Sequence, residues 1–227
     1  TAATELSGDP GAADSIMHET WDVERAPTGA KDSLTPSVPS DSSGVTLGRG
    51  YDMGARSAAT IEAELGAAGV DEKLAKKYRG AAKKRGDDAR KWIKKNKPFA
   101  AITADQEKTL FRQEYQQVSD ETVRFLADPS RGYTPDGDGW KLQVNFKDLN
   151  PKILAFLVDL KFRGDLNDSS WAYIRDAVVA NSLETLQPLV ADAKKHKKFF
   201  YNNYNRYLPR CNIVGASPVT EKEWNKK

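Results

Sequence analysis

Eleven residues near the front of the chain constrain its fold more than any other stretch. Residues 44–54 read Gly-Val-Thr-Leu-Gly-Arg-Gly-Tyr-Asp-Met-Gly, with four glycines among β-branched and bulky apolar residues. Glycine permits sharp bends and lets another group approach the backbone closely. The stretch therefore predicts a short, bent β element.

Two polar side chains, Thr46 and Asp52, stand in this glycine-rich frame. Six positions separate them, and an even spacing places two side chains on one face of a continuous strand. A turn at Gly48 or Gly50 instead makes them face each other across a hairpin. Both geometries bring the two polar groups together.

The remainder of the chain predicts helices. The apolar residues 153–162 indicate a central buried helix, because they surround nearly its whole circumference. Thr103 and Gln106 form a capping-box start to a long helix. We expect helices at about 10–24, 57–66, 71–97 with breaks near Gly80 and Gly86, 103–128, 151–163, 171–180, 183–195 and 197–208, with loop from Cys211 onward.

These elements predict an α+β fold that is predominantly α, with a small N-terminal β-hairpin lobe. At 227 residues the chain suffices for one good-sized domain. We predict a linker over residues 1–9, a domain over 10–215 and a C-terminal tail over 216–227. The chain starts on a small, polar segment without methionine, so we expect a C-terminal fragment of a larger protein.

The rare residues exclude several classes of protein. A single cysteine, Cys211, rules out an internal disulfide, and two histidines leave too few ligands for the usual zinc sites. No apolar run approaches the roughly 18 residues of a membrane span, so we expect no membrane insertion.

The charge is unevenly distributed. Residues 71–97 hold twelve Lys and Arg against four Asp and Glu, and residues 191–227 hold nine against three. Two basic segments on an otherwise acidic body predict a polyanionic partner. The alternative is that their Lys and Arg side chains only keep the helices solvated. Only Tyr78 and Trp92 interleave with the first basic segment, so we expect no nucleic-acid partner.

Residues 43–54 read Ser-Gly-Val-Thr-Leu-Gly-Arg-Gly-Tyr-Asp-Met-Gly. This stretch resembles the pesticin-like branch of the phage-lysozyme superfamily. The order of predicted helices and Phe-Arg-Gly-Asp-Leu at 162–166 are also similar to that family. The resemblance implies a lysozyme-like fold over roughly residues 10–210. Such muramidase domains occur in bacteriocins, phage proteins and the C-termini of type VI secretion spike proteins and effectors.

The resemblance implies three catalytic positions, a glutamate that ends the first helix, a threonine on the β element and an aspartate six residues later. They fall on Glu24, Thr46 and Asp52. Two alternatives stay open: Glu19 in place of Glu24, because the loop before the strand is long, and Asp41 in place of Asp52, because phage lysozymes carry their aspartate before the threonine.

Glycoside hydrolysis needs these residue types. One carboxylic acid protonates the leaving oxygen, and a second carboxylate activates water or stabilises the oxocarbenium-like centre. Glu24 follows Val23 and Trp21 at a predicted helix C-terminus, where the helix dipole favours a protonated acid. Asp52, between glycines, is expected to stay ionised, with Thr46 holding a water. The alternatives are a turn residue for Asp52 and an ordinary strand residue for Thr46.

Three further residues are candidates for binding the glycan. Tyr51 is a candidate for stacking on a sugar ring, and a core position is its alternative. Arg49 and Arg163 are candidates for binding the carboxylates of the glycan's peptide or lactyl groups, and structural ion pairs are their alternative.

The sequence thus predicts a monomeric muramidase that cleaves the MurNAc-β-1,4-GlcNAc bond of peptidoglycan glycan strands without metal or cofactor. A lytic transglycosylase on the same fold and a non-catalytic peptidoglycan-binding module are the alternatives. The resemblance implies an antibacterial effector, secreted or delivered to the periplasm or cell wall of a target bacterium, with an immunity protein as a further partner.

Overall fold

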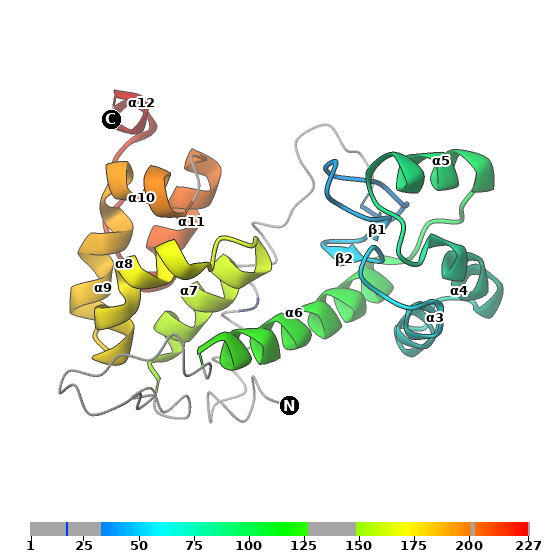
Figure 1. The fold of residues 1–227 in the computed structure, drawn as a ribbon, viewed down its shortest axis with the longest axis horizontal. Helices are drawn as coiled ribbons and strands as arrows, with labels where there is room; N and C mark the ends of the chain where they lie inside the picture. The colour runs from blue at the N-terminus through cyan, green and yellow to red at the C-terminus, as the bar shows by residue number, and fades with distance from the viewer. Residues whose placement is uncertain (1–16, 18–32, 127–148, 201–202, 227) are drawn as a thin grey trace. The chain divides into compact units, whose positions relative to one another are not determined.

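The computed structural model describes residues 17, 33–126, 149–200 and 203–226. These residues are mostly helical, with a small two-stranded antiparallel sheet near the N-terminus, so the α+β, predominantly α class is confirmed (Figure 1). The predicted first helix, with Glu19 and Glu24, lies outside the described residues except for Met17, which is helical. The predicted division into linker, domain and tail stays a prediction.

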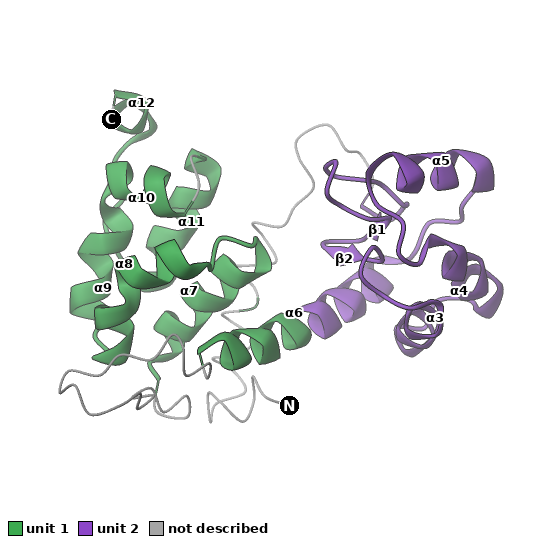
Figure 2. Ribbon diagram, viewed as in Figure 1, with its two compact units in different colours: residues 1–23, 115–227 green, residues 24–114 purple. Residues whose placement is uncertain are grey.

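The chain divides into two compact units (Figure 2). We call residues 24–114 the hairpin unit, and residues 1–23 with 115–227 the helical unit.

The hairpin unit contains the sheet and the basic helices. Its elements are β1 (Thr46–Leu47), β2 (Tyr51–Asp52), α3 (Ala58–Ala67), α4 (Glu72–Tyr78), the 3-10 helix η1 (Arg79–Ala81), α5 (Gly86–Asn96) and the first part of α6 (Ala104–Leu126). Local sequence explains their starts. Ser57 and Asp71 cap α3 and α4, and Thr103 with Gln106 forms the predicted capping box before α6.

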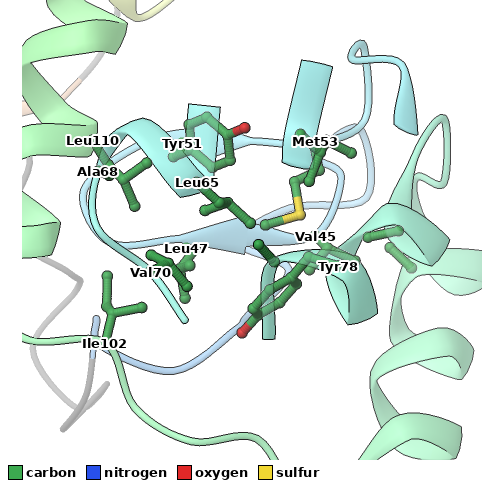
Figure 3. Close-up of a cluster of buried hydrophobic side chains, with 14 of the residues drawn as sticks. Val45, Leu47, Tyr51, Met53, Leu65, Ala68, Val70, Tyr78, Ile102 and Leu110 are labelled. Atoms are coloured by element: carbon green, nitrogen blue, oxygen red, sulfur yellow. The ribbon is translucent and has the colours of Figure 1, made fainter. Parts of the chain in front are cut away.

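An apolar core holds the hairpin against these helices (Figure 3). Alternate residues of the hairpin point into it, among them Leu47 and Tyr51, which pair across the two strands. Further core side chains of the unit are Val45, Met53, Ile61, Leu65, Ala68, Val70, Tyr78, Trp92, Ile102 and Leu110. The intervening residues, Thr46 and Asp52, are thereby directed to the other face of the hairpin.

The helical unit is built around the predicted central helix. Its elements are the second part of α6, α7 (Pro151–Phe162), α8 (Asp168–Val179), α9 (Leu183–Ala191), α10 (Ala193–Phe199), α11 (Tyr204–Val214) and α12 (Glu221–Lys226). Asn150 caps α7, and eight consecutive residues of α7, 153–160, are buried, as its apolar sequence predicts. Gly164, with a φ of 73°, ends it.

Two predicted starts and stops between α8 and α10 are wrong. Helix α8 begins at Asp168 rather than Trp171. The side-chain oxygen of Asn167 accepts from the backbone N–H groups of Ser169 and Ser170, and the Ser170 hydroxyl oxygen accepts from the Asn167 backbone N–H. The predicted helix over 183–195 is divided at Asp192, whose side chain caps α10.

The predicted stop before Pro209 and the loop from Cys211 onward are also wrong. Pro209 lies inside α11, and Cys211 follows it there. Proline at the sixth residue removes one backbone hydrogen bond, and the burial of Tyr207, Arg210 and Cys211 offsets that loss. The tail carries a further short helix, α12.

Among the described helices, none combines the length and the apolar composition that a membrane span requires.

Candidate functional site

The glycine-rich residues form a hairpin. Residues 48–50 make the turn, with positive φ at Gly48 (59°) and Gly50 (102°), which glycine adopts without strain. The register places Thr46 directly opposite Asp52. Of the two geometries that the sequence allows, the hairpin is therefore the observed one, and residues directly opposite each other project from the same face.

Backbone N–H groups surround the Asp52 carboxylate. Gly44 N–H donates to both carboxylate oxygens, at 3.1 Å from Oδ1 and 3.0 Å from Oδ2, and Gly54 N–H donates to Oδ1 at 2.6 Å. Such donors interact best with an ionised carboxylate. They fix the orientation of the carboxylate and also close the base of the hairpin.

The peptide groups of Gly44 connect the two polar side chains. Its N–H donates to Asp52, and its carbonyl accepts from the Thr46 hydroxyl at 3.3 Å. Thr46 is only 6% exposed, whereas Asp52 is half-buried. The arrangement brings together the candidate water positioner and the candidate water activator.

Gly44→Ala tests how tightly this base is packed. A Cβ at position 44 lies closer than 3.0 Å to Asp52 Oδ1 and to the backbone N of Gly54, so backbone must move. We expect a loss of at least about 2 kcal/mol in the free energy of unfolding, measured by chemical denaturation.

The matched control is Gly66→Ala, in helix α3, where an added Cβ meets nothing within 4 Å. There alanine is expected to stabilise the protein by up to about 1 kcal/mol. Equal effects of the two substitutions contradict the close packing at Gly44.

A partly buried charge cluster anchors strand β2. The Arg56 guanidinium, whose side chain is 10% exposed, donates Nη1–H to the Asp52 carbonyl, Nε–H to Glu64 Oε2 at 2.8 Å and Nη2–H to Glu114 Oε2 at 2.5 Å. Its Cζ lies 4.4 Å from the centroid of the Tyr51 ring, and the Tyr51 hydroxyl donates to Glu64 Oε2 at 2.8 Å. One guanidinium thus serves two carboxylates and the backbone of the candidate catalytic aspartate.

The pKa of Glu114 is raised to about 7. Burial is the main cause; Arg56 opposes it, and the negative charges of Glu64 and Asp52 add to it. Burial likewise raises the pKa of the Tyr51 hydroxyl, with a further contribution from its hydrogen bond to Glu64. The cluster therefore contains a carboxyl group that titrates near neutral pH.

This shift makes stability depend on pH. The folded-state pKa lies above the unfolded value of 4.5, so the stabilisation by protonated Glu114 is complete below about pH 4.5 and is lost as the pH rises through about 7. We expect Glu114→Gln to remove this part of the dependence, on the order of 2–3 kcal/mol. Urea unfolding at several pH values from 5 to 8 measures it, and parallel curves for both proteins contradict the assignment.

Arg49 lies in the turn of the hairpin, where its Nε is 3.7 Å from Glu107 Oε1. The two side chains are 13% and 6% exposed. Arg49 therefore forms a structural ion pair, which was the alternative to binding the glycan.

The other candidates fall in different surroundings. Tyr51 is 1% exposed, so its ring is an anchor of β2 in the core and offers no face to a sugar. Arg163 is exposed at the C-terminus of α7, in the helical unit. Asp41, the alternative to Asp52, has a 94% exposed side chain and pairs with Arg90. Both candidate acids, Glu24 and Glu19, lie outside the described residues.

Sequence reasoning missed the partly buried cluster around Arg56. The available signal was the position of Glu114, one helical turn from the core residues Leu110 and Phe111. Carboxylates on the apolar stripe of a helix need partners.

Within the described ranges, no group of three or more His, Cys, Asp or Glu side chains is arranged to hold a metal ion.

The fold and site define a mostly helical α+β protein with a polar pair across a glycine-rich hairpin. A family model for a domain of unknown function, DUF8812, matches residues 18–210, and the chain belongs to that family. No curated protein matches the chain.

Proposed function

We propose that the protein is a muramidase, which hydrolyses the MurNAc-β-1,4-GlcNAc bond of peptidoglycan. The observation that carries the proposal is the Thr46–Asp52 pair, placed in register across the hairpin and joined through Gly44. In this mechanism Asp52 activates the water or stabilises the positive charge of the transition state, and Thr46 helps to hold the water.

The general acid of this mechanism is Glu24, with Glu19 as the alternative. Both precede the described part of the hairpin unit, so the assignment rests on the resemblance of residues 43–54 and on the chemistry. The acid must be protonated when the glycosidic oxygen leaves, whereas Asp52 must be charged. The two carboxyl groups therefore need different surroundings. The backbone N–H donors beside Asp52 supply the surroundings that the charged carboxylate needs.

The test is the release of reducing ends from purified peptidoglycan, with products identified by mass spectrometry. Wild type is expected to release reducing sugars, Glu24→Gln to lose the activity and Glu19→Gln to keep it. Anhydro ends in the products make the protein a transglycosylase. Tight binding with no release makes it a binding module and refutes the proposed hydrolysis.

We also propose that the basic helices hold the protein on the anionic wall. On α4 and α5, the acidic residues Glu72, Asp87 and Asp88 pair with neighbouring cations of the same helix. Lys94, Lys95 and other exposed lysines add positive charge beyond these pairs. Such contacts weaken with salt, because mobile ions screen exposed charges.

Lys94→Glu combined with Lys95→Glu tests this role. We expect roughly tenfold weaker co-sedimentation with peptidoglycan at low salt and unchanged turnover of short soluble oligomers. Lys83 and Arg85 are unsuitable, because they donate to the carbonyls of Ala55 and Ser42 beside the hairpin.

The matched control makes the same change in charge on α6, with Lys108→Glu and Arg112→Glu, both exposed in the same unit. An equal loss of wall binding in the control assigns the effect to net charge and removes the role of α5.

A further inference from the structure

The side chain of Arg56 has hydrogen bonds that join the backbone of Asp52 to helices α3 and α6. Strand β2 has two residues, and its ladder to β1 is correspondingly short. A two-stranded hairpin of this size has little stability of its own. Contacts outside the sheet must therefore hold the Asp52 backbone.

The geometry of the Arg56 guanidinium suits this task. A planar guanidinium presents donors in fixed directions, so one side chain can engage the Asp52 carbonyl, Glu64 and Glu114 together. A lysine ammonium keeps the charge but lacks this geometry. The Tyr51 ring packs against the guanidinium, and its hydroxyl shares Glu64 Oε2 with Arg56.

At such a site the reaction rate depends strongly on the exact position of the carboxylate. A carboxylate that activates water has to stand at a defined distance from the reacting carbon, and a displacement of about 1 Å can cost about a hundredfold in rate. The carboxylate of Asp52 is oriented by Gly44 and Gly54, and its main chain is held by Arg56.

We propose that Arg56 is the positioning residue of Asp52. Through its bonds to Glu64 and Glu114 it sets the place of the Asp52 backbone, and thereby the place of the carboxylate. The catalytic part of this inference rests on the proposed muramidase function, whereas the structural part is measurable without any activity.

Two readouts test the inference in Arg56→Lys. The first is the pair of backbone amide resonances of Gly44 and Gly54, which donate to the Asp52 carboxylate and report its position by NMR. The second is the division of the kinetic effect between kcat and KM on soluble oligomers. Both are measured at a temperature where circular dichroism shows each variant folded.

We expect Arg56→Lys to shift both amide resonances and to lower kcat at least about tenfold, with KM changed less than twofold. Glu64→Gln is the second variant in case Arg56→Lys does not fold. It keeps an acceptor for Tyr51 and Arg56 but removes a charge, so we expect smaller changes in the same direction. The matched control is Arg79→Met. Arg79 is exposed and pairs at 3.1 Å with Glu62, which lies on α3, the helix that also carries Glu64.

The control is expected to leave the resonances and kcat unchanged. Folded Arg56→Lys and Glu64→Gln proteins with wild-type resonances and wild-type kcat overturn the inference. If wild type itself releases no sugar, shifted resonances in Arg56→Lys leave the structural role of Arg56 standing and refute the muramidase function alone.

Discussion

Asp52→Asn should reduce the release of reducing ends from peptidoglycan by at least about a hundredfold. The substitution keeps the size of the side chain and one acceptor oxygen, and it removes the charge that, in the proposed mechanism, activates water or stabilises the transition state. An asparagine oxygen can still accept from Gly44 and Gly54, whose N–H groups hold the native Oδ1. The amide nitrogen then meets the Gly44 N–H, so we also expect a stability loss of about 1 kcal/mol.

The structural alternative for Asp52 makes a different prediction. If the carboxylate only closes the hairpin, the activity of Asp52→Asn falls in proportion to the unfolded fraction and no further. Initial rates and thermal unfolding of the same sample distinguish the two cases.

Asp41→Asn is the matched control, because it makes the same chemical change at the exposed alternative candidate. It should leave the rate unchanged. A lost rate in Asp41→Asn with a normal rate in Asp52→Asn reverses the assignment.

The sequence could predict that Thr46 and Asp52 lie together because local rules determine it, although it left a continuous strand open beside the hairpin. Gly48 and Gly50 permit positive φ, the alternate apolar residues Leu47 and Tyr51 face the core, and Thr46 and Asp52 must then face the other way. Helix starts at Ser57, Thr103 and Asn150 follow equally local capping rules.

The charge cluster behind the hairpin could not be predicted in the same way. Arg56, Glu64 and Glu114 meet through tertiary packing, and 50 positions separate the last two. Propensities and spacing describe each residue separately, and only the fold decides which arginine meets which carboxylate.

A second charge cluster, which is buried, carries the largest expected effect on stability. In the helical unit, Arg210 of α11 is fully buried and donates Nε–H to Asp159 Oδ2 of α7 and Nη2–H to Asp165 Oδ2, both at 2.6 Å. Nη1–H donates to the carbonyl of Phe200 at 3.0 Å. The bonds therefore connect α11 to the central helix and to the residues that follow its C-terminus.

Arg210→Met should lower the free energy of unfolding by about 3–5 kcal/mol, because it leaves the buried Asp159 carboxylate without its cation. The loss is a desolvation effect, so removing the stranded charge should restore stability. Arg210→Met combined with Asp159→Leu is expected to recover most of the difference, since Asp165 is 17% exposed and can reach water. Denaturant unfolding of wild type, both single variants and the double variant forms a complete cycle. If the double variant is as unstable as Arg210→Met, the cost lies in lost packing and in the vacated Phe200 carbonyl, and the charge argument for this cluster is wrong.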